Sequence, residues 1–438
     1  MSEAEHDGSR WTRIAVWAKR LLIGWRRTLL AVWFSQFLMM AAFGFSLPFV
    51  AYHVQALGVE DHNEVRRVVA LFEAAAPLTF MIFAPIWGMV ADRWGRKPML
   101  VRANIGAMVV LGGMGLAPTV GWLLFFRLGQ GMLTGTMSAA QTLVSAAVPD
   151  QRRGVAMGLL ATAVSSGVMA GQFLGGLFAD WVSYQACFFV SAALALVAAL
   201  VVLIWVEERF VRVDAAPSSP AGLRAAFSGG VGRMWSALRP VWPILVMLAG
   251  GAFIMTMERP VLPLLVQELN GGVREGAATI NGQLGALSAL CAVFAGLAVG
   301  RLADRVSSIL LVIVAAVGAA LFCAPIAVVG TLGGLFVTRA GMALFVAGLD
   351  PIFQAWLSRT ADVQRQGMVF GCGASLRSMA WFMGPLLGNV IADIWDMRSV
   401  YIAKSLTLLM MVPMVLLAYA IMRRASRARD DVAQCRPA

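Results

Sequence analysis

The sequence predicts an all-α polytopic membrane protein with twelve transmembrane helices in two pseudo-symmetric six-helix bundles and both termini in the cytoplasm. Of its 438 residues, 60% are hydrophobic and only 13% are charged, a balance that exposes more apolar surface than water tolerates. The apolar residues form blocks of roughly 20 or more without the period-two alternation of barrel strands. Backbone groups in lipid must pair internally, so these blocks are expected to be helices.

Charged and turn residues separate the apolar blocks and give the bounds of the expected spans. The first six lie near 28–54, 68–91, 99–118, 120–147, 155–182 and 186–206, and the second six near 241–266, 278–303, 307–330, 332–357, 367–394 and 399–422. The expected units are a cytoplasmic N-terminal segment (1–27), two halves (28–206 and 241–422), a polar cytoplasmic linker (207–240) and a cytoplasmic tail (423–438). Residues 11–27 mix basic and apolar side chains, which fits either an amphipathic segment on the membrane surface or a plain extension of the first helix.

The basic residues determine the expected orientation. They alternate onto one side of the membrane, in the N-terminal segment, the loop with Arg93 and Arg96, the linker and the tail, and this side is the cytoplasm. Topology accounts for the net charge of +12, so no nucleic-acid partner is expected. The N-terminus has no short apolar stretch before a cleavage site, so no cleaved signal peptide is expected. The five cysteines show no paired spacing, and neither a metal nor a cofactor is expected.

The two halves repeat each other at a nearly constant offset. Six matches support this, three at 212 residues (Val54–Gln55 with Val266–Gln267, Asp92 with Asp304, Arg127 with Arg339) and three at 213 (Gly171 with Gly384, Gly175 with Gly388, Asp180 with Asp393). Each half has an even number of spans, so the halves are expected to be parallel repeats about an axis along the membrane normal. A binding site is then expected at their interface.

A motif between the second and third spans points to a family. The run GMVADRWGRK (88–97) resembles the major facilitator superfamily signature at this loop, and residues 300–305 are a weaker copy that lacks the later glycine and basic pair. The resemblance implies that this loop latches the outward-facing state, with Asp92 as the central residue, and that its glycines permit a tight turn. The expected latch residues are Gly88, Asp92, Arg93, Gly95, Arg96, Asp304 and Arg305. The alternative is that they only fix topology.

Two further motifs narrow the branch of the family. The pattern Leu123-x-x-x-Arg127-x-x-Gln130-Gly131 is similar to a signature of proton-coupled members, in which the arginine influences a nearby carboxyl. The fifth span resembles the glycine-rich signature of drug antiporters, although Gln172 stands where that signature has proline. Glycines four residues apart let two helices approach and slide, and ordinary tight packing needs them too. This glycine face comprises Gly158, Gly167, Gly171, Gly175 and Gly176, with Gly384 and Pro385 in the eleventh span.

Ionisable residues inside the spans are costly and are therefore functional candidates. At 1.5 Å per residue, Glu73, Arg127 and Arg339 lie roughly 8 to 10 Å below the outer face, with Glu258 and Arg259 at a similar level. Opposite charges at a common depth can neutralise each other. We expect Glu73 or Glu258 to take up a proton in the outward-facing state in competition with substrate, with Arg127 favouring the anion. The competing interpretation is a static Glu–Arg pair that only holds helices together.

Two other charged residues lie deeper in the second half. Asp350 is followed by Pro351 and predicts a helix break or gate in preference to a cation site, while Arg377 meets either an anionic substrate group or a partner carboxylate. The resemblance implies that the first, fourth, seventh and tenth helices line a pathway, and their Met and Phe side chains suit varied amphipathic molecules. The cavity candidates are Gln36, Met40, Phe45, Met137, Met257, Asp350 and Arg377. Ordinary helix packing would use many of the same residues.

The resemblance implies a transporter that exports amphipathic, drug-like small molecules in exchange for protons by alternating access, as a monomer in a bacterial inner membrane. A fold does not fix direction or substrate. A dedicated exporter of one metabolite, such as a siderophore or sugar, and a proton-coupled importer are therefore the alternatives. An enzyme is not expected, because the sequence has no H-E-x-x-H, G-x-S-x-G or P-loop motif. A sensor or scaffold without transport is the remaining class.

Overall fold

The computed structural model describes residues 24–208, 238–239, 241–302, 305–360 and 366–434, and the regular elements in these ranges are all helices. The first half contains α2 (Trp25–Ser46), η1 (Leu47–Phe49), α3 (Val50–Ala56), α4 (His62–Trp94), α5 (Arg96–Leu116), α6 (Val120–Leu133), α7 (Thr136–Ala147), η2 (Asp150–Arg152), α8 (Arg153–Trp181) and α9 (Tyr184–Trp205). The second half contains α12 (Trp242–Met257), α13 (Leu262–Leu269), α14 (Ala277–Leu302), α15 (Ser308–Cys323), η3 (Ala324–Ala327), α16 (Leu332–Val346), α17 (Leu349–Thr360), α18 (Gln366–Ile394) and α19 (Ser399–Gln434).

Ten helical segments within the described ranges are long and apolar enough to cross a membrane. The chain is therefore a multi-pass membrane protein. Two of the twelve expected spans, 120–147 and 367–394, are not among these ten. The first is divided between α6 and α7, and the second corresponds to α18.

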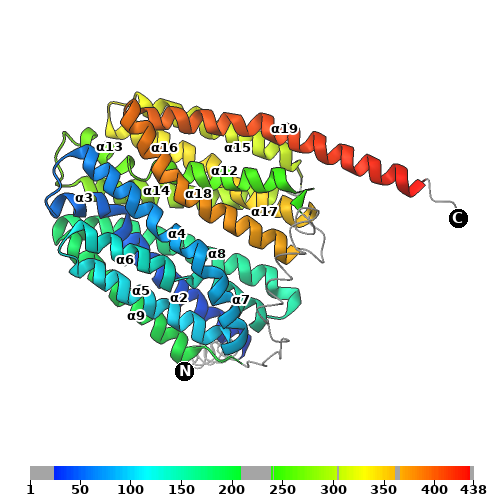
Figure 1. Cartoon of the computed structure of the whole chain (residues 1–438), viewed down its shortest axis with the longest axis horizontal. Helices are drawn as coiled ribbons and strands as arrows, with labels where there is room; N and C mark the ends of the chain where they lie inside the picture. Colours follow the sequence, from blue (N-terminus) through cyan, green and yellow to red (C-terminus); the bar gives the residue numbers. More distant parts are fainter. Residues whose placement is uncertain (1–23, 209–237, 240, 303–304, 361–365, 435–438) are drawn as a thin grey trace, which may run out of the picture.

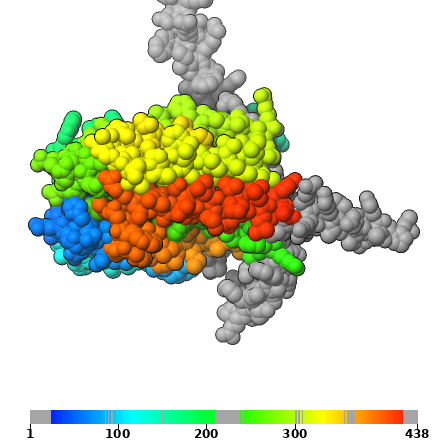
Figure 2. Space-filling model, turned by 90° about the horizontal axis from the view of Figure 1, so that it is seen from above, coloured from blue at the N-terminus to red at the C-terminus, as the bar shows by residue number. Residues whose placement is uncertain are grey.

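The helices form two bundles that lie side by side (Figure 1). In the N-bundle, α2–α9, helix α2 packs against α8 and α9, and α5 packs against α9. In the C-bundle, α12–α19, helix α12 packs against α18 and α19, and α15 packs against α16 and α19. The bundles meet along two seams, α8 with α14 and α4 with α18. Figure 2 shows the C-bundle from outside, with α19 running along its length.

Four of the expected spans are interrupted rather than continuous. The first and seventh break at Pro48 and Pro260, which lie 212 residues apart, because proline has no backbone N–H and clashes with the preceding turn. The fourth breaks at Gly135, whose φ of 122° disfavours any side chain, and the tenth breaks at Ala347 and Gly348. Three of these spans, expected at 28–54, 241–266 and 332–357, are nevertheless among the ten candidate spans. The break in the tenth lies at Ala347 and Gly348, shortly before the Asp350–Pro351 pair at which a break was expected. The breaks recur in both bundles, which extends the sequence repeat to backbone geometry.

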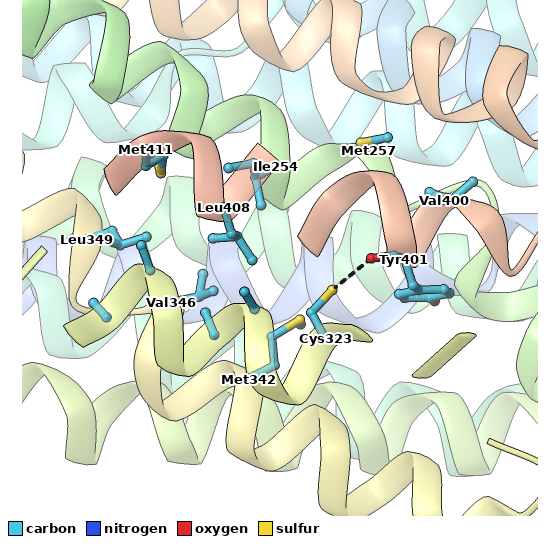
Figure 3. Packing of buried hydrophobic residues seen from close by; sticks show 14 of the residues in the cluster. Ile254, Met257, Cys323, Met342, Val346, Leu349, Val400, Tyr401, Leu408 and Met411 are labelled. Carbon is cyan, nitrogen blue, oxygen red and sulfur yellow. Dashed lines mark hydrogen bonds between the residues drawn. The ribbon is translucent and has the colours of Figure 1, made fainter. Parts of the chain in front are cut away.

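One buried apolar cluster lies mainly in the C-bundle and extends to Phe45, Phe49 and Tyr52 of the N-bundle. In the C-bundle, Met342 of α16 and Leu349 of α17 lie in one buried cluster with Leu408 and Met411 of α19 (Figure 3). Cys323 at the end of α15 joins this cluster, with its Sγ 3.4 Å from the carbonyl oxygen of Tyr401. Helix association in lipid depends on such close packing, since lipid tails are as apolar as the side chains.

Candidate functional site

Glu73 of α4 lies at the centre of a charged cluster between the bundles. Its Oε2 lies 2.7 Å from Nη1 of Arg259, and its Oε1 lies 3.5 Å from Nη2 of Arg127. Only 7% of the Glu73 side chain is exposed, so its charge depends on these two guanidinium groups. Arg127 is fixed by further bonds within the N-bundle: its Nη1 donates to Oε1 of Gln130 at 2.6 Å and its Nε to the carbonyl of Phe72 at 3.1 Å.

Glu258 is the carboxylate of a second cluster, which belongs to the C-bundle. Its Oε1 lies 2.6 Å from Nη1 of Arg339 on α16 and 2.7 Å from Nζ of Lys404 on α19. All three groups are buried, and Lys404 is fully so. Within the described ranges, the second carboxylate oxygen, Oε2, has no hydrogen-bond partner. Lys404 was not among the predicted site residues. Like Glu258, it is an ionisable residue inside an apolar span, which is the criterion that would have identified it.

The two clusters are joined through the backbone at the break between α12 and α13. Glu258 and Arg259 are consecutive, yet Glu258 turns into the C-bundle and Arg259 reaches the N-bundle. Pro260 ends the regular helix at this point and lets neighbouring side chains point in different directions. Opposite charges at a common depth were expected to pair. The structure assigns Arg259 to Glu73 and Arg339 to Glu258.

A set of polar contacts joins the bundles at the end where α3 and α13 lie, which we call the α3 end (Figure 1). Nε2 of Gln55 donates to Oε1 of Gln267 at 2.8 Å. These glutamines are the same position in the two halves, so the pseudo-two-fold axis passes between them. The hydroxyl of Tyr52 donates to the carbonyl of Pro263 at 2.9 Å, and Nδ2 of Asn281 donates to the carbonyl of Pro48 at 3.1 Å.

Two aspartates of the repeat close the seams at the same end. Asp180, at the end of α8, accepts hydrogen bonds at 2.7 Å from both the backbone N–H and the hydroxyl of Thr279 in the first turn of α14. Asp393, at the end of α18, pairs with Arg66 and, at 3.2 Å, with Arg67 near the start of α4. The repeat offset identified both aspartates, but their role in joining the bundles was missed. We call them the aspartate clasps.

At the opposite end, no hydrogen bond or ion pair links two described residues of different bundles. The contacts there stay within one bundle: Arg27 with Glu207, Glu208 with the start of α5, and Asp350 with Gln354. Among the described residues, the polar contacts between the bundles therefore lie at the level of the charged cluster and at the α3 end.

The motif expected to act as a latch lies at this opposite end. Gly88, Asp92 and Arg93 lie in the last turns of α4, where the side chains are outside the described part, and Asp304 lies outside it altogether. Gly95 has φ 98° and separates α4 from α5, as expected for the glycine of a tight turn. Arg305 is exposed. The backbone N–H groups of Arg96 and Lys97 donate to the carboxylate of Glu208 at 2.9 and 2.8 Å, a contact that sequence analysis missed.

The glycine face packs α8 against α2 within the N-bundle. A Cβ placed on Gly167, Gly171 or Gly175 would lie 2.3 to 2.4 Å from the carbonyl oxygens of Phe37, Ala41 and Phe45 respectively. Gly176 faces the other way and approaches Ala278 of α14, so it belongs to the seam between the bundles. A Cβ placed on Gly158 would meet nothing within 4 Å, so this glycine is not part of the close approach. Gly384 of α18 packs on α12 in the same manner, beside the buried Pro385.

The cavity candidates divide into packed and accessible residues. Met40, Phe45 and Met257 lie against the glycines of α8 and α18, and the Phe45 ring is 5.4 Å from that of Phe178. Gln36 is buried, with its Nε2 3.4 Å from the carbonyl of Thr136. These four are held in helix packing.

Three candidates remain accessible. The Asp350 side chain is 52% exposed and lies 3.7 Å from Arg377, which sits on α18, while Met137 is half-buried. The partner that Arg377 finds in the chain is thus a carboxylate. Asp350 lies in the first turn of α17, directly after the break in the tenth span.

Two repeated helical bundles that meet around buried charges and broken helices define a secondary-transporter fold. The sequence matches the model of the Major Facilitator Superfamily over residues 32–335 and 260–434. The chain belongs to this superfamily.

Individual relatives agree with this assignment. The chain is 31% identical over 379 residues to a multidrug resistance protein MdtG of Citrobacter koseri, covering 86% of this chain and 91% of that protein. It is 29% identical over 424 residues to the MdtG protein of Serratia proteamaculans, covering 94% and 98%.

Solved structures share the fold at low identity. The nucleoside transporter NupG superposes with a TM-score of 0.71 at 14% identity, covering 90% of this chain and all of that one. The human organic anion transporter MFSD10 superposes with a TM-score of 0.67 at 17% identity, covering 89% and 99%.

Proposed function

We propose that the protein is a secondary active transporter that exports amphipathic, drug-like small molecules from the cytoplasm in exchange for protons by alternating access. The names of the MdtG relatives support export of drugs, and their similarity extends over most of both chains. The polar contacts that join the bundles at the α3 end support alternating access, because two repeated bundles that rock against each other must make and break such contacts. A bacterial inner membrane is the corresponding location.

The topology of this proposal has twelve spans with both termini in the cytoplasm. The α6–α7 pair and α18 supply the two spans beyond the ten recognised by length and hydropathy. The units are the cytoplasmic segment 1–27, the halves 28–206 and 241–422, the linker 207–240 and the tail 423–438, in a monomer. The α3 end then faces the periplasm, and the state described is closed on that side.

The Glu73–Arg259 ion pair is the observation that supports proton coupling most directly. Its partners lie on different bundles, 186 residues apart in sequence, so any opening of the α3 end separates them. Glu73 would then keep only Arg127, at 3.5 Å, as a counter-charge in a site newly open to the periplasm. A buried carboxylate that loses its nearest counter-charge binds a proton more readily. We therefore assign the proton to Glu73.

We assign Glu258 a static role, because its ion pairs do not cross between the bundles. Both of its cationic partners, Arg339 and Lys404, belong to the C-bundle and move with it. A rigid-body movement of the bundles leaves these distances unchanged, so the cluster has no cause to gain or lose a proton during the cycle. Of the two carboxyls expected as candidates, Glu73 is the switch and Glu258 the anchor.

Substrate recognition is assigned to the accessible polar pair at the helix break in the C-bundle. Asp350 and Arg377 present opposite charges on neighbouring helices, and Met137 is half-buried in the corresponding helix of the N-bundle. Flexible apolar side chains with a few polar groups suit substrates of varied shape.

Transport in proteoliposomes tests the function. A preformed proton gradient should drive export of dyes or antibiotics by the unaltered protein, and Glu73→Gln should abolish this while preserving substrate exchange without a gradient. Glu268→Gln, which removes an exposed carboxylate paired with Arg398 at 2.8 Å, is the matched control and should transport normally. Proton-driven export that survives Glu73→Gln would remove Glu73 from the mechanism. Failure to move any screened compound would remove the transport function.

A further inference from the structure

An apolar groove with a basic mouth lies on the membrane-facing surface of the N-bundle, away from the charged clusters. It has a volume of about 620 Å³, which falls within the range of small-molecule sites, roughly 300–1,000 Å³. One face of α5 forms its floor, from Pro98 to Val109, while Leu133 at the end of α6 and Leu203 near the end of α9 form its walls. We call it the α5 groove.

The floor of the α5 groove is accessible to lipid. Ile105 and Val109 are 42% and 51% exposed, and Leu203 is 54% exposed. Gly106 lets the end of α6 approach closely, because a Cβ there would lie 2.9 Å from Leu133. The groove is thus an indentation between helices that the bilayer must fill.

Lys97 and Arg102 are the charged residues of the lining, and both lie towards the start of α5. No salt bridge to either side chain occurs among the residues that the structure describes. The Arg102 guanidinium carbon lies 3.4 Å from the centre of the Trp87 ring, and Trp87 is itself fixed by a 2.7 Å bond from Nε1 to the carbonyl of Met132. Nε and Nη1 of Arg102 are buried without a hydrogen-bond partner in the same set of residues. The stacking on Trp87 therefore holds the guanidinium in place, with these two nitrogens enclosed.

Glu208 is an acidic residue beside this mouth, and its carboxylate already accepts hydrogen bonds from the backbone. Its carboxylate accepts hydrogen bonds from the backbone N–H groups of Arg96 and Lys97, at 2.9 and 2.8 Å. A carboxylate at a helix N-terminus neutralises the free N–H groups of the first turn. Among the described residues, no carboxylate forms a salt bridge with the side chain of Lys97 or Arg102.

We propose that the α5 groove binds an anionic glycerophospholipid of the cytoplasmic leaflet, such as phosphatidylglycerol. Its phosphate lies between Lys97 and Arg102, and one acyl chain lies along Val101, Ile105 and Val109. A guanidinium held in a fixed position beside an ammonium suits phosphate, and basic pockets between helices on the cytoplasmic side bind anionic head groups. From Lys97 to Val109 the helix rises about 18 Å, which matches a chain that enters from the surface. The leaflet follows from the topology proposed above.

The occupant has to be both anionic and apolar, because the two parts of the groove have different chemistry. A free phosphate ion satisfies the mouth and leaves the floor to other lipids. A zwitterionic lipid fills the floor but brings a cationic group close to Lys97 and Arg102. Only an anionic lipid matches charge at one end and apolar surface along the rest, so we assign the site to it.

Lipid retention by the purified full-length protein, measured by native mass spectrometry, tests the assignment. The probes are phosphatidylglycerol and phosphatidylcholine with identical acyl chains, and inorganic phosphate as a competitor. Phosphatidylglycerol should be retained preferentially, and Lys97→Gln and Arg102→Gln should each reduce its retention about fivefold. Arg102→Lys should keep most of it. Arg274→Gln, which removes an exposed charge at the α3 end, should have no effect.

A second variant tests the apolar part of the groove. Val109→Trp fills the floor at an exposed position without changing charge, and should reduce retention of phosphatidylglycerol while the protein elutes as the unaltered one does in size-exclusion chromatography. Equal retention of both lipids, or unchanged retention in the Lys97→Gln/Arg102→Gln double variant, would overturn the proposal. Unchanged retention in Val109→Trp, or displacement of the lipid by millimolar phosphate, would reduce the site to a surface anion contact. The readout is binding, so it is independent of transport.

Discussion

Arg259 of the C-bundle and Glu73 of the N-bundle form an ion pair across the interface, with Nη1 2.7 Å from Oε2. The residue before Arg259, Glu258, pairs only with groups of its own bundle. Two consecutive residues therefore make different kinds of contact. The Arg259–Glu73 pair joins the bundles, whereas the Glu258 pairs lie within the C-bundle.

Loss of the Glu73–Arg259 pair should favour opening of the α3 end. With Arg259→Gln, Glu73 keeps only Arg127, and one charged bond that exists solely in the closed state is removed. Spin labels at Glu60→Cys and Val273→Cys, both exposed near this end, in a background without the native cysteines, should report a longer distance by electron paramagnetic resonance. Arg398→Gln is the control, since its partner Glu268 lies in the same bundle. Identical distance distributions for Arg259→Gln and the unaltered protein would contradict a gating role.

The two aspartate clasps should contribute similarly, because they occupy equivalent positions on the two seams. Asp180→Asn and Asp393→Asn each weaken bonds to a carboxylate, for which about 1.5–3 kcal/mol is typical of a charged hydrogen bond. The same spin-label pair should show partial opening in each variant and greater opening in the double variant. Asp396→Asn is a suitable control, because its Oδ1 accepts only a local bond from the N–H of Met397 at 2.6 Å. An effect confined to one clasp would refute the equivalence.

Removing the carboxylate of the C-bundle cluster should destabilise the protein more than removing one of its cations. Glu258→Gln leaves Arg339 and Lys404 buried without a counter-charge, and breaking a buried pair in this way costs about 3–5 kcal/mol. Lys404→Met leaves the Glu258–Arg339 pair at 2.6 Å, so its effect should be smaller. Thermal unfolding in detergent measures both. Glu268→Gln should change the midpoint little, as expected for an exposed pair, and equal shifts in Glu258→Gln and Lys404→Met would argue against the anchor.

The glycine face should be intolerant of even one methyl group. A Cβ at position 171 would lie 2.3 Å from the carbonyl oxygen of Ala41, so Gly171→Ala must push α8 away from α2. Overpacking of this kind costs about 1–3 kcal/mol. Gly158→Ala is matched in chemistry and in helix but meets nothing within 4 Å, and should be neutral or slightly stabilising. Equal thermal stability of the two variants would show that the packing of α8 on α2 adapts to added volume.

Much of the fold was predictable because lipid imposes simple rules on sequence. Backbone pairing requires helices, basic residues predict sidedness, and the offset of 212 or 213 residues predicts two halves. A break was predicted at Asp350–Pro351, close to the one at Ala347 and Gly348. The breaks at Pro48 and Pro260 were not predicted, because proline is tolerated in a transmembrane helix wherever neighbouring groups take up the freed carbonyls. Whether a span bends or breaks there depends on the other helices.

For the charged residues too, the sequence predicted one property and the tertiary structure decided another. The sequence by itself placed Glu73, Arg127, Glu258, Arg259 and Arg339 at one depth, because depth follows from helix rise. Which charges meet depends on the rotation of each helix about its axis and on the backbone break after Glu258, and both are set by packing between helices far apart in sequence. Only the tertiary structure therefore separates Arg259, which reaches Glu73 in the opposite bundle, from Glu258, which stays with Arg339 and Lys404.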